Sequence, residues 1–210
     1  MLGYFSRHGG DYLIALCEHL AISGISLALA CAVGIPLGIL CSRERRVRFW
    51  ITGIFAVLRV IPSLAILFLC IPIMGTGIKP AVTALVFLAM PPILINTTLA
   101  FSSIPAPVLE TAFAMGMSKR RIFFLVKAPL SLPVVLAGFK TATVEVIASA
   151  SLAAYIGAGG LGTIIFTGLG LLRSELLLIG GISVAIISIT ADFFLYRLER
   201  RLVRYRHLVP

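Results

Sequence analysis

The chain reads PAVTALVFLAMPPILINTTLAFSSIPAPVL from Pro80 to Leu109, and no side chain in this stretch carries a charge. Further uncharged stretches cover residues 20–42, 60–78 and 146–172. Each is near or above the ~18–20 residues with which an α-helix crosses a bilayer. The sequence therefore predicts a polytopic membrane protein.

The overall composition points the same way. Hydrophobic residues make up 60% of the 210 residues, charged residues make up 12%, and the mean hydropathy is +1.09, whereas soluble domains carry roughly a quarter charged residues. Five spans of about 22 residues leave too little chain for a separate catalytic domain, since such domains rarely fall below about 50 residues. We expect an all-α membrane protein that is not itself an enzyme and holds no cofactor or metal of its own.

The net charge of +10 is distributed unevenly along the chain. Most lysines and arginines fall in clusters at 43–48, 119–127 and 197–206, and the intervening loops hold only Arg7, Lys79 and Arg173. The positive-inside rule assigns such clusters to the cytoplasmic face, so we expect the N-terminus outside and the C-terminus inside. No basic stretch is interleaved with the aromatic side chains that bind single-stranded nucleic acid, which argues against a nucleic-acid partner.

About five transmembrane helices are expected, near residues 20–41, 49–74, 79–101, 134–156 and 176–196. Pro36 is a candidate kink in the first span, and the pair Pro91–Pro92 is expected to break the third, because proline removes helical hydrogen bonds. Residues 1–18 would form an extracytoplasmic N-terminal segment, residues 19–202 the transmembrane domain, and residues 203–210 a basic cytoplasmic tail.

The loop at about 103–133 is long for a simple connection and needs a structure of its own. Apolar residues recur there with helical spacing: Leu109, Ala112, Phe113, Gly116 and Met117. Pro107 suits the first turn of this helix, and Ser118 suits the N-cap of a second helix that ends before Pro129. The pattern predicts a cytoplasmic helical hairpin, which either lies on lipid headgroups or docks a cytoplasmic partner.

Three charged residues fall inside the expected spans, where each would cost about 2.5–3.5 kcal/mol if it faced lipid at mid-bilayer. Lys140 is shallow enough to reach the headgroups. Arg59 and Glu145 lie at similar depths, which favours an ion pair between the second and fourth spans over direct contact with a ligand. Asp192 is expected to meet interfacial water or Arg197.

The glycine-rich stretch 157–162 follows the fourth span. It is expected to form a bend near an outer gate, where residues without a Cβ permit tight packing; it lacks the lysine and serine or threonine of a phosphate-binding loop. Asn96, Thr97 and Thr98 line a pathway or hydrogen-bond between helices; the sequence leaves both open.

The cytoplasmic segment resembles a known motif. Glu110-Thr111-Ala112, then Gly116, then Val126-Lys127-Ala128-Pro129 is similar to the EAA loop of ABC importer permeases. In that family the loop forms a coupling helix that docks on the ATP-hydrolysing subunit. The resemblance extends over about residues 19–202 and implies the type I ABC importer permease fold.

The resemblance implies the coupling residues, and the residue patterns described above suggest two further groups. The coupling residues would be Glu110, Thr111, Ala112, Gly116, Met117, Ser118 and Pro129. The translocation path would include Arg59, Pro62, Ser63, Asn96 and Glu145. The gate or bend would be formed by Gly157, Gly159, Gly160 and Gly162.

Three further stretches resemble the glycine betaine, carnitine and choline permeases: IPSLAI at 61–66, GIKPA at 77–81 and YIGAGGLG at 155–162. The resemblance implies a bacterial inner-membrane importer for a quaternary-ammonium osmoprotectant. Its partners would be two ATP-binding subunits that use ATP and Mg, a second permease, the same or different, an extracytoplasmic substrate-binding protein and the lipid bilayer.

Three alternatives remain. A methionine or other amino-acid importer permease is similar in size and carries the glycine-rich stretch, but it resembles the second and third spans less. An ion-coupled secondary carrier would not require the cytoplasmic hairpin, and no second half is evident. An intramembrane enzyme would need a catalytic constellation that the three histidines and Asp192 do not supply.

Overall fold

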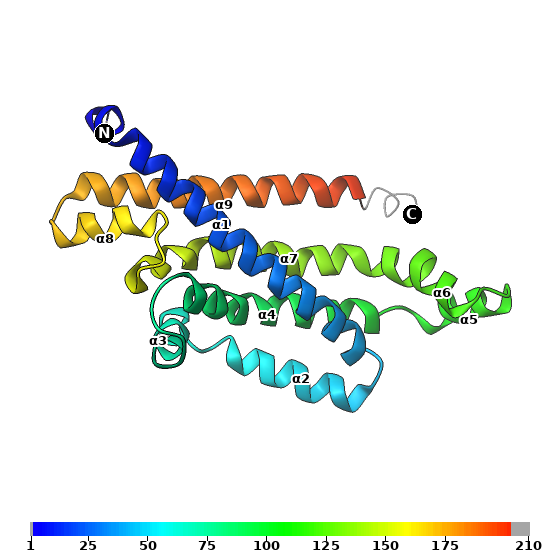
Figure 1. Cartoon of the computed structure of the whole chain (residues 1–210). Helices are drawn as coiled ribbons and strands as arrows, with labels where there is room; N and C mark the ends of the chain where they lie inside the picture. Colours follow the sequence, from blue (N-terminus) through cyan, green and yellow to red (C-terminus); the bar gives the residue numbers. More distant parts are fainter. Residues whose placement is uncertain (1, 203–210) are drawn as a thin grey trace.

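The computed structural model describes residues 2–202, which form helices joined by short turns (Figure 1). No strand occurs in this part of the chain. The basic tail expected at 203–210 lies outside the described residues. In chain order the elements are α1 (Leu2–Cys41), α2 (Arg45–Leu58), α3 (Ser63–Met74), α4 (Ile78–Ser102), α5 (Ala106–Ala114), α6 (Lys119–Ile122), the π-turn η1 (Phe123–Lys127), α7 (Ala128–Ala150), the 3₁₀ segment η2 (Ser151–Ile156), α8 (Gly162–Gly170) and α9 (Ser174–Leu202).

Four helical stretches are long and apolar enough to cross a bilayer, at 8–41, 78–102, 119–156 and 174–202. The bent pair α2–α3 supplies a fifth if the two helices are taken together. The expected all-α architecture of about five spans is therefore confirmed.

Helix α4 lies at the centre of the molecule. In Figure 1, α2, α4, α7 and α9 run side by side, and α1 crosses this layer obliquely; α1 packs against both α4 and α7. The main apolar core gathers where these helices meet, around Leu85 and Ile93 of α4, Ile22 and Ala30 of α1, and Val146 of α7. Helices α1, α2, α3 and α7 thus all pack on α4, and α9 packs on α7.

Glycines allow α1 and α7 to approach α4 closely. A Cβ added at Gly38 of α1 would lie 2.7 Å from the Cβ of Thr97, and one at Gly138 of α7 would lie 2.6 Å from both Asn96 Cβ and the Pro92 carbonyl oxygen. Both separations are shorter than real Cβ contacts. These two positions accept only glycine because small residues are what let helix backbones meet in a membrane.

The expected break at Pro91–Pro92 was wrong, because α4 is continuous through both residues. Each proline removes one backbone donor, but both side chains are buried in the packed core. Packing against α1 and α7 holds the helical path, and neighbouring helices commonly support proline inside membrane helices in this way. Helix α1 likewise continues through Pro36.

The second expected span is broken instead. Helix α2 ends at Leu58, α3 begins at Ser63, and the two are bent by 92°. The break precedes Pro62, which has no N–H to donate and disfavours helical geometry at the residue before it. The single span expected at 49–74 is thus two helices that meet at a sharp bend.

Two further boundaries differ from the expectation. The first helix begins at Leu2, not near Leu20, so residues 2–18 of the expected N-terminal segment continue α1; only His8 departs from helical geometry. The helix that starts at Lys119 does not end before Pro129, because η1 joins it to α7 without interruption. A π-turn shifts the register of the backbone hydrogen bonds, so the helix continues through Pro129 although this residue has no N–H to donate.

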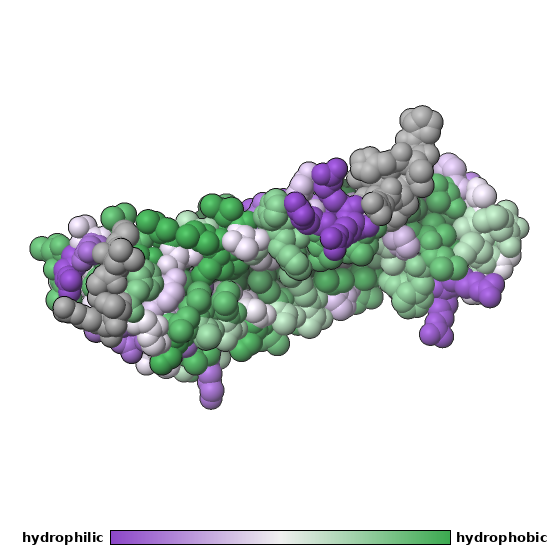
Figure 2. All heavy atoms as spheres, turned by 90° about the horizontal axis from the view of Figure 1, so that it is seen from above, coloured by the Kyte–Doolittle hydropathy of each residue, from purple (hydrophilic) through white to green (hydrophobic). Residues whose placement is uncertain are grey.

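Apolar side chains cover most of the face shown in Figure 2, and hydrophilic residues form separate patches, one right of the middle and others near the two ends. Phe49, Val57, Ile73 and Ile189 are each more than two-thirds exposed. Such exposure is expected where lipid or another subunit, rather than water, surrounds the helices.

Replacing Gly38 by alanine tests the close approach of α1 to α4. We expect Gly38→Ala to lower the free energy of unfolding by about 1–3 kcal/mol, because the new methyl group would overlap Thr97. The control is Gly24→Ala on the same helix, where an added Cβ meets nothing within 4 Å and no loss is expected. Equal losses in the two variants, measured by denaturation in mixed micelles, would contradict the packing.

Candidate functional site

The helical hairpin predicted from the sequence is present as α5, a turn and α6. Pro107 lies in the first turn of α5, and the Ser118 hydroxyl accepts a hydrogen bond from the Arg121 N–H at 3.4 Å, which caps α6. Gly116 has φ of +76°, and the Met117 N–H donates to the Ala112 carbonyl at 3.2 Å. This is a Schellman-type helix end, in which the positive φ favours glycine.

The apolar stripe expected on α5 is only partly buried. Ala112 is buried, and Leu109 and Met117 are half-buried, whereas Phe113 is 52% exposed and Met115 is 69% exposed. Successive side chains project in different directions around the turn. The hairpin therefore packs through Leu109, Ala112 and Met117 and leaves Phe113 and Met115 exposed. The hairpin projects at one end of the molecule (Figure 1), and the two exposed apolar residues belong to the last turn and the C-cap of α5.

The remaining coupling candidates divide between the tip and the base of the hairpin. Glu110 and Thr111 are exposed on α5, and the Thr111 hydroxyl donates to the Pro107 carbonyl at 2.9 Å. Pro129 lies in the first turn of α7, beyond the π-turn, and is half-buried. The structure therefore keeps Glu110, Thr111 and Gly116 together and places Pro129 apart from them.

The ion pair expected between Arg59 and Glu145 is present: Nη2 of the arginine donates to Oε1 of the glutamate. Arg59 lies at the bend between α2 and α3, and Glu145 lies on α7. Their side chains are 48% and 28% exposed, and the second oxygen of Glu145 is buried without a hydrogen-bond partner. The pair joins the broken span α2–α3 to α7. The second oxygen of Glu145 and the other guanidinium N–H groups of Arg59 remain able to form hydrogen bonds.

The other path candidates do not all gather at this pair. Pro62 ends the bend and Ser63 begins α3, so both lie near Arg59 in the chain. Asn96 instead donates from its amide to the Pro92 carbonyl at 2.8 Å and lies against Gly138. Thr98 donates to the Gly38 carbonyl at 3.2 Å, which is the helix-to-helix alternative for this residue.

A second ion pair links α7 to α9. Lys140 Nζ lies 3.3 Å from Asp192 Oδ1 and 5.3 Å from the centre of the Tyr196 ring. The ion-pair partner of Asp192 is therefore Lys140 and not Arg197, while contact of Asp192 with interfacial water and of Lys140 with headgroups stays a prediction. The two charged side chains meet where α7 packs on α9, and their mutual attraction offsets part of the free-energy cost of removing each charge from water.

Two neighbouring residues of α1 that the sequence analysis did not single out attach this helix to the glycine-rich loop, through Glu18, and to α7, through His19. The Gly160 N–H donates to Glu18 Oε2 at 2.8 Å, and the fully buried His19 ring lies 3.0 Å from the Ile147 carbonyl through Nε2. The available signal was a histidine within an apolar helix, because an imidazole needs a polar partner when it is buried; Glu18 beside it is exposed.

The backbone of this loop requires glycine at several positions. Gly157, Gly159 and Gly160 have φ of +77°, +83° and +83°, a region that other residues rarely adopt. A Cβ at Gly162 would overlap the Ser151 carbonyl. The loop thus makes a tight bend between η2 and α8, as expected from the sequence, while its role as a gate stays a prediction.

An aromatic cluster lies beside this bend. Tyr155 of η2 packs edge-to-face on Phe68 of α3 and on Phe166 of α8, with ring centres 6.0 Å and 4.7 Å apart. The Gly77 N–H also donates to the Ile156 carbonyl at 2.8 Å. These contacts join the bend, α3 and α8 at one end of the molecule. Among the described residues, no group of three or more His, Cys, Asp or Glu side chains could hold a metal ion.

Comparison with known proteins agrees with this geometry. A family model described as binding-protein-dependent transport system inner membrane component matches residues 34–204. The carnitine transport permease protein OpuCB of Listeria monocytogenes is 41% identical over 95% of this chain and 91% of its own length. The choline transport system permease protein OpuBB of Bacillus subtilis is 38% identical over 95% of this chain and 92% of its own.

Solved structures share the fold. A chain of the inward-facing MetNI methionine ABC transporter superposes with a TM-score of 0.80 at 23% identity, over 91% of this chain and 95% of that one. A chain of an amino acid ABC transporter with histidines gives 0.76 at 16% identity, over 93% and 96%. At these identities the likeness establishes the architecture alone.

A double-mutant cycle tests the Arg59–Glu145 pair. We expect Arg59→Gln and Glu145→Gln each to reduce stability and the double variant to lose less than their sum, with a coupling of about 1–2 kcal/mol, because each single variant leaves one partner uncompensated. The pair Arg173–Glu175, 3.7 Å apart and more than half exposed, is the control and should show no coupling. Additive losses at 59 and 145 in thermal unfolding would refute the pair.

Proposed function

Because the chain belongs to the family of binding-protein-dependent transport system inner membrane components, we propose that it is the permease of an importer for quaternary-ammonium osmoprotectants. The observation that carries the substrate class is the identity of 41%, 38% and 37% to permeases named for carnitine, for choline and for glycine betaine, carnitine and choline. The alternative, transport of methionine, is supported only by the fold that this chain shares with the methionine transporter MetNI at 23% identity. An ion-coupled carrier is not supported by the family match.

In this proposal the hairpin of α5 and α6 couples the permease to an ATP-binding subunit. Phe113 and Met115 would enter an apolar groove of that subunit, and Gly116 would keep the turn narrow. Glu110, Thr111, Ala112, Met117 and Ser118 would position the docking helix, and Pro129 would act from the base of α7. The projection of the hairpin and its exposed apolar tip support this role.

The translocation path would pass the bend between α2 and α3. Arg59 and Glu145 are the charged groups there, Pro62 and Ser63 shape the bend, and a carboxylate would attract the cationic end of a substrate. Asn96 would act indirectly, through the packing of α4 on α7. The outer gate would be the loop 157–162, whose attachment to Glu18 supports a defined resting position.

The assembly would contain two permeases, alike or different, two ATP-binding subunits that hydrolyse ATP with Mg, and an extracytoplasmic binding protein. The permease itself would contribute no catalytic group. Selectivity would rest largely in the binding protein, where aromatic side chains can hold a quaternary ammonium by cation–π attraction. The chain is a multi-pass membrane protein, and its basic clusters favour a cytoplasmic C-terminus.

Uptake by the reconstituted assembly tests the substrate class. Proteoliposomes would hold this permease with the ATP-binding subunit and binding protein encoded beside it, and we expect ATP-dependent uptake of labelled glycine betaine, carnitine or choline. Excess unlabelled methionine should not compete. Uptake of methionine, or uptake without ATP, would contradict the proposal.

Substitution at the hairpin turn tests the coupling role. We expect Gly116→Asp to abolish most uptake and co-purification of the ATP-binding subunit, because it adds bulk and charge at the docking surface. Gly75→Asp is a matched control: Gly75 has φ of +75°, close to the +76° of Gly116, and an added Cβ meets nothing within 4 Å at either position. Backbone strain is therefore similar, and only the position differs. If Gly116→Asp shows normal uptake and normal co-purification of the ATP-binding subunit, the coupling role of the hairpin is contradicted.

Single-cysteine labelling tests the orientation. In a background free of the four native cysteines, Thr76→Cys should react with an impermeant reagent from outside and Arg120→Cys from the cytoplasm. Both positions are exposed, so lack of reaction would report the membrane and not burial. Reaction of both from the same side would contradict the five-span topology.

A further inference from the structure

The glycine-rich loop 157–162 lies directly against two neighbouring residues of α1. The Gly160 N–H donates to Oε2 of Glu18 at 2.8 Å, and a Cβ added at Gly159 would overlap the same carboxylate. A Cβ added at Gly160 would lie 3.3 Å from Nδ1 and 3.4 Å from Cα of His19. The loop backbone is therefore fitted to this part of α1, and the missing Cβ of Gly159 leaves the room that the carboxylate occupies.

The two residues of α1 make attachments of different kinds. His19 is fully buried, and its Nε2 lies 3.0 Å from the Ile147 carbonyl of α7. Separating these two groups would leave polar atoms buried without a partner, which is costly. Glu18 is exposed, so its carboxylate can exchange the Gly160 N–H for water at a much smaller cost. Helix α1 can therefore release the loop and still remain attached to α7.

The other hydrogen bonds at the start of the loop stay within its own neighbourhood. The Gly157 N–H donates to the Ala154 carbonyl of η2 at 3.1 Å. The Ala158 N–H donates to the Ala153 carbonyl, also of η2 and also at 3.1 Å. The glycines of the loop have positive φ, and glycine moves between backbone conformations more readily than other residues do. The loop can therefore shift together with η2 without breaking these two bonds.

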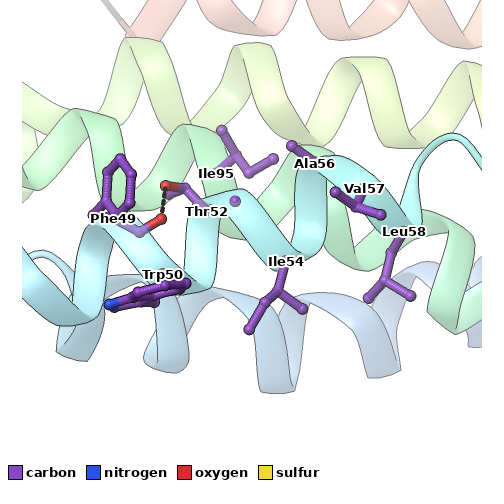
Figure 3. Close-up of a pocket in the computed structure, with 9 residues that line it drawn as sticks. Phe49, Trp50, Thr52, Ile54, Ala56, Val57, Leu58 and Ile95 are labelled. Atoms are coloured by element: carbon purple, nitrogen blue, oxygen red, sulfur yellow. Dashed lines mark hydrogen bonds between the residues drawn. The ribbon is translucent and has the colours of Figure 1, made fainter.

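A shift of the loop would reach the broken span α2–α3. Tyr155, two residues before the loop, packs edge-to-face on Phe68 of α3 with ring centres 6.0 Å apart. Within the described chain this span is held less tightly than the core helices are. No residue of α2 is buried, and an apolar hollow of about 760 Å³ lies along α2 and against Ile95 of α4 (Figure 3). Movement of the loop can therefore pass through Tyr155 to α3.

We propose that Glu18 is a positioning residue of the outer gate. In the closed state its carboxylate holds the loop at Gly160. During opening this hydrogen bond breaks, His19 stays on α7, and Tyr155 moves with the loop away from Phe68. The proposal rests on the role of the loop 157–162 as the outer gate, and it adds the residue that keeps this gate closed.

Hydrogen–deuterium exchange of the purified full-length permease measures the attachment without any transport. In Glu18→Ala the peptide that covers 157–162 should exchange about tenfold faster, because a hydrogen bond to a charged group is lost. Glu18→Gln keeps an oxygen that accepts and should exchange at a rate between those of Glu18→Ala and the wild type. The control is Tyr12→Phe, which removes the 2.8 Å hydrogen bond between Tyr12 and Ser183 from the same helix and should leave the loop unchanged.

ATP hydrolysis by the reconstituted assembly distinguishes a gate residue from a merely structural one. Without the binding protein, Glu18→Ala should hydrolyse ATP several-fold faster than the wild type, because losing the bond shifts the population away from the closed state. Stimulation by the loaded binding protein should fall accordingly. Glu18→Gln should restore most of the stimulation, and Tyr12→Phe should match the wild type. An unfolded variant would lose hydrolysis, so a gain cannot come from misfolding.

Different results overturn different steps of the proposal. Unchanged exchange in Glu18→Ala, or the same acceleration in Tyr12→Phe, would show that Glu18 does not hold the loop. Faster exchange with unchanged or lower hydrolysis would show that the attachment is not part of a gate. If the wild-type assembly took up no quaternary-ammonium compound with ATP, the proposed function would fail, whereas the exchange measurement would still decide whether Glu18 holds the loop.

Discussion

Gly38 of α1 and Gly138 of α7 bring two helix backbones against α4, and the rest of the structure depends on these contacts. Without a Cβ at either position, Thr97 and Asn96 pack directly on the neighbouring helix. Lipid tails compete equally well for apolar side chains, so close packing and not water exclusion holds helices together in a membrane. The central position of α4 follows from this constraint.

The flanks of the layer are joined to α7 by charge. Glu145 pairs with Arg59 at the bend between α2 and α3, and Lys140 pairs with Asp192 on α9. Each pair connects α7 to an element with few buried residues of its own, and each would be costly to separate in a medium of low dielectric. Helix α7 is thus held by α4 and by two ion pairs, and the hairpin of α5 and α6 continues directly into it through η1.

Loops with positive φ lie at opposite ends of this assembly. Gly116 narrows the tip of the hairpin, and Gly157, Gly159 and Gly160 form the bend that Glu18 holds. In both places the backbone conformation rather than a side chain defines the surface. The long helices between them provide the rigid connection.

The sequence by itself determined the apolar spans and the hairpin with its caps at Gly116 and Ser118, because the length of an apolar stretch and the choice of turn residues are local properties. It also determined the Arg59–Glu145 pair, because charges are costly in lipid and the depth of each residue follows from its position in its span. Only the tertiary structure decided that Pro91 and Pro92 remain helical while the chain bends before Pro62. Proline weakens a helix wherever it occurs, and the outcome depends on whether neighbouring helices support the weakened turn. The same holds for Glu18, whose partner on the glycine loop is distant in sequence and becomes a neighbour only when α1 packs beside α7.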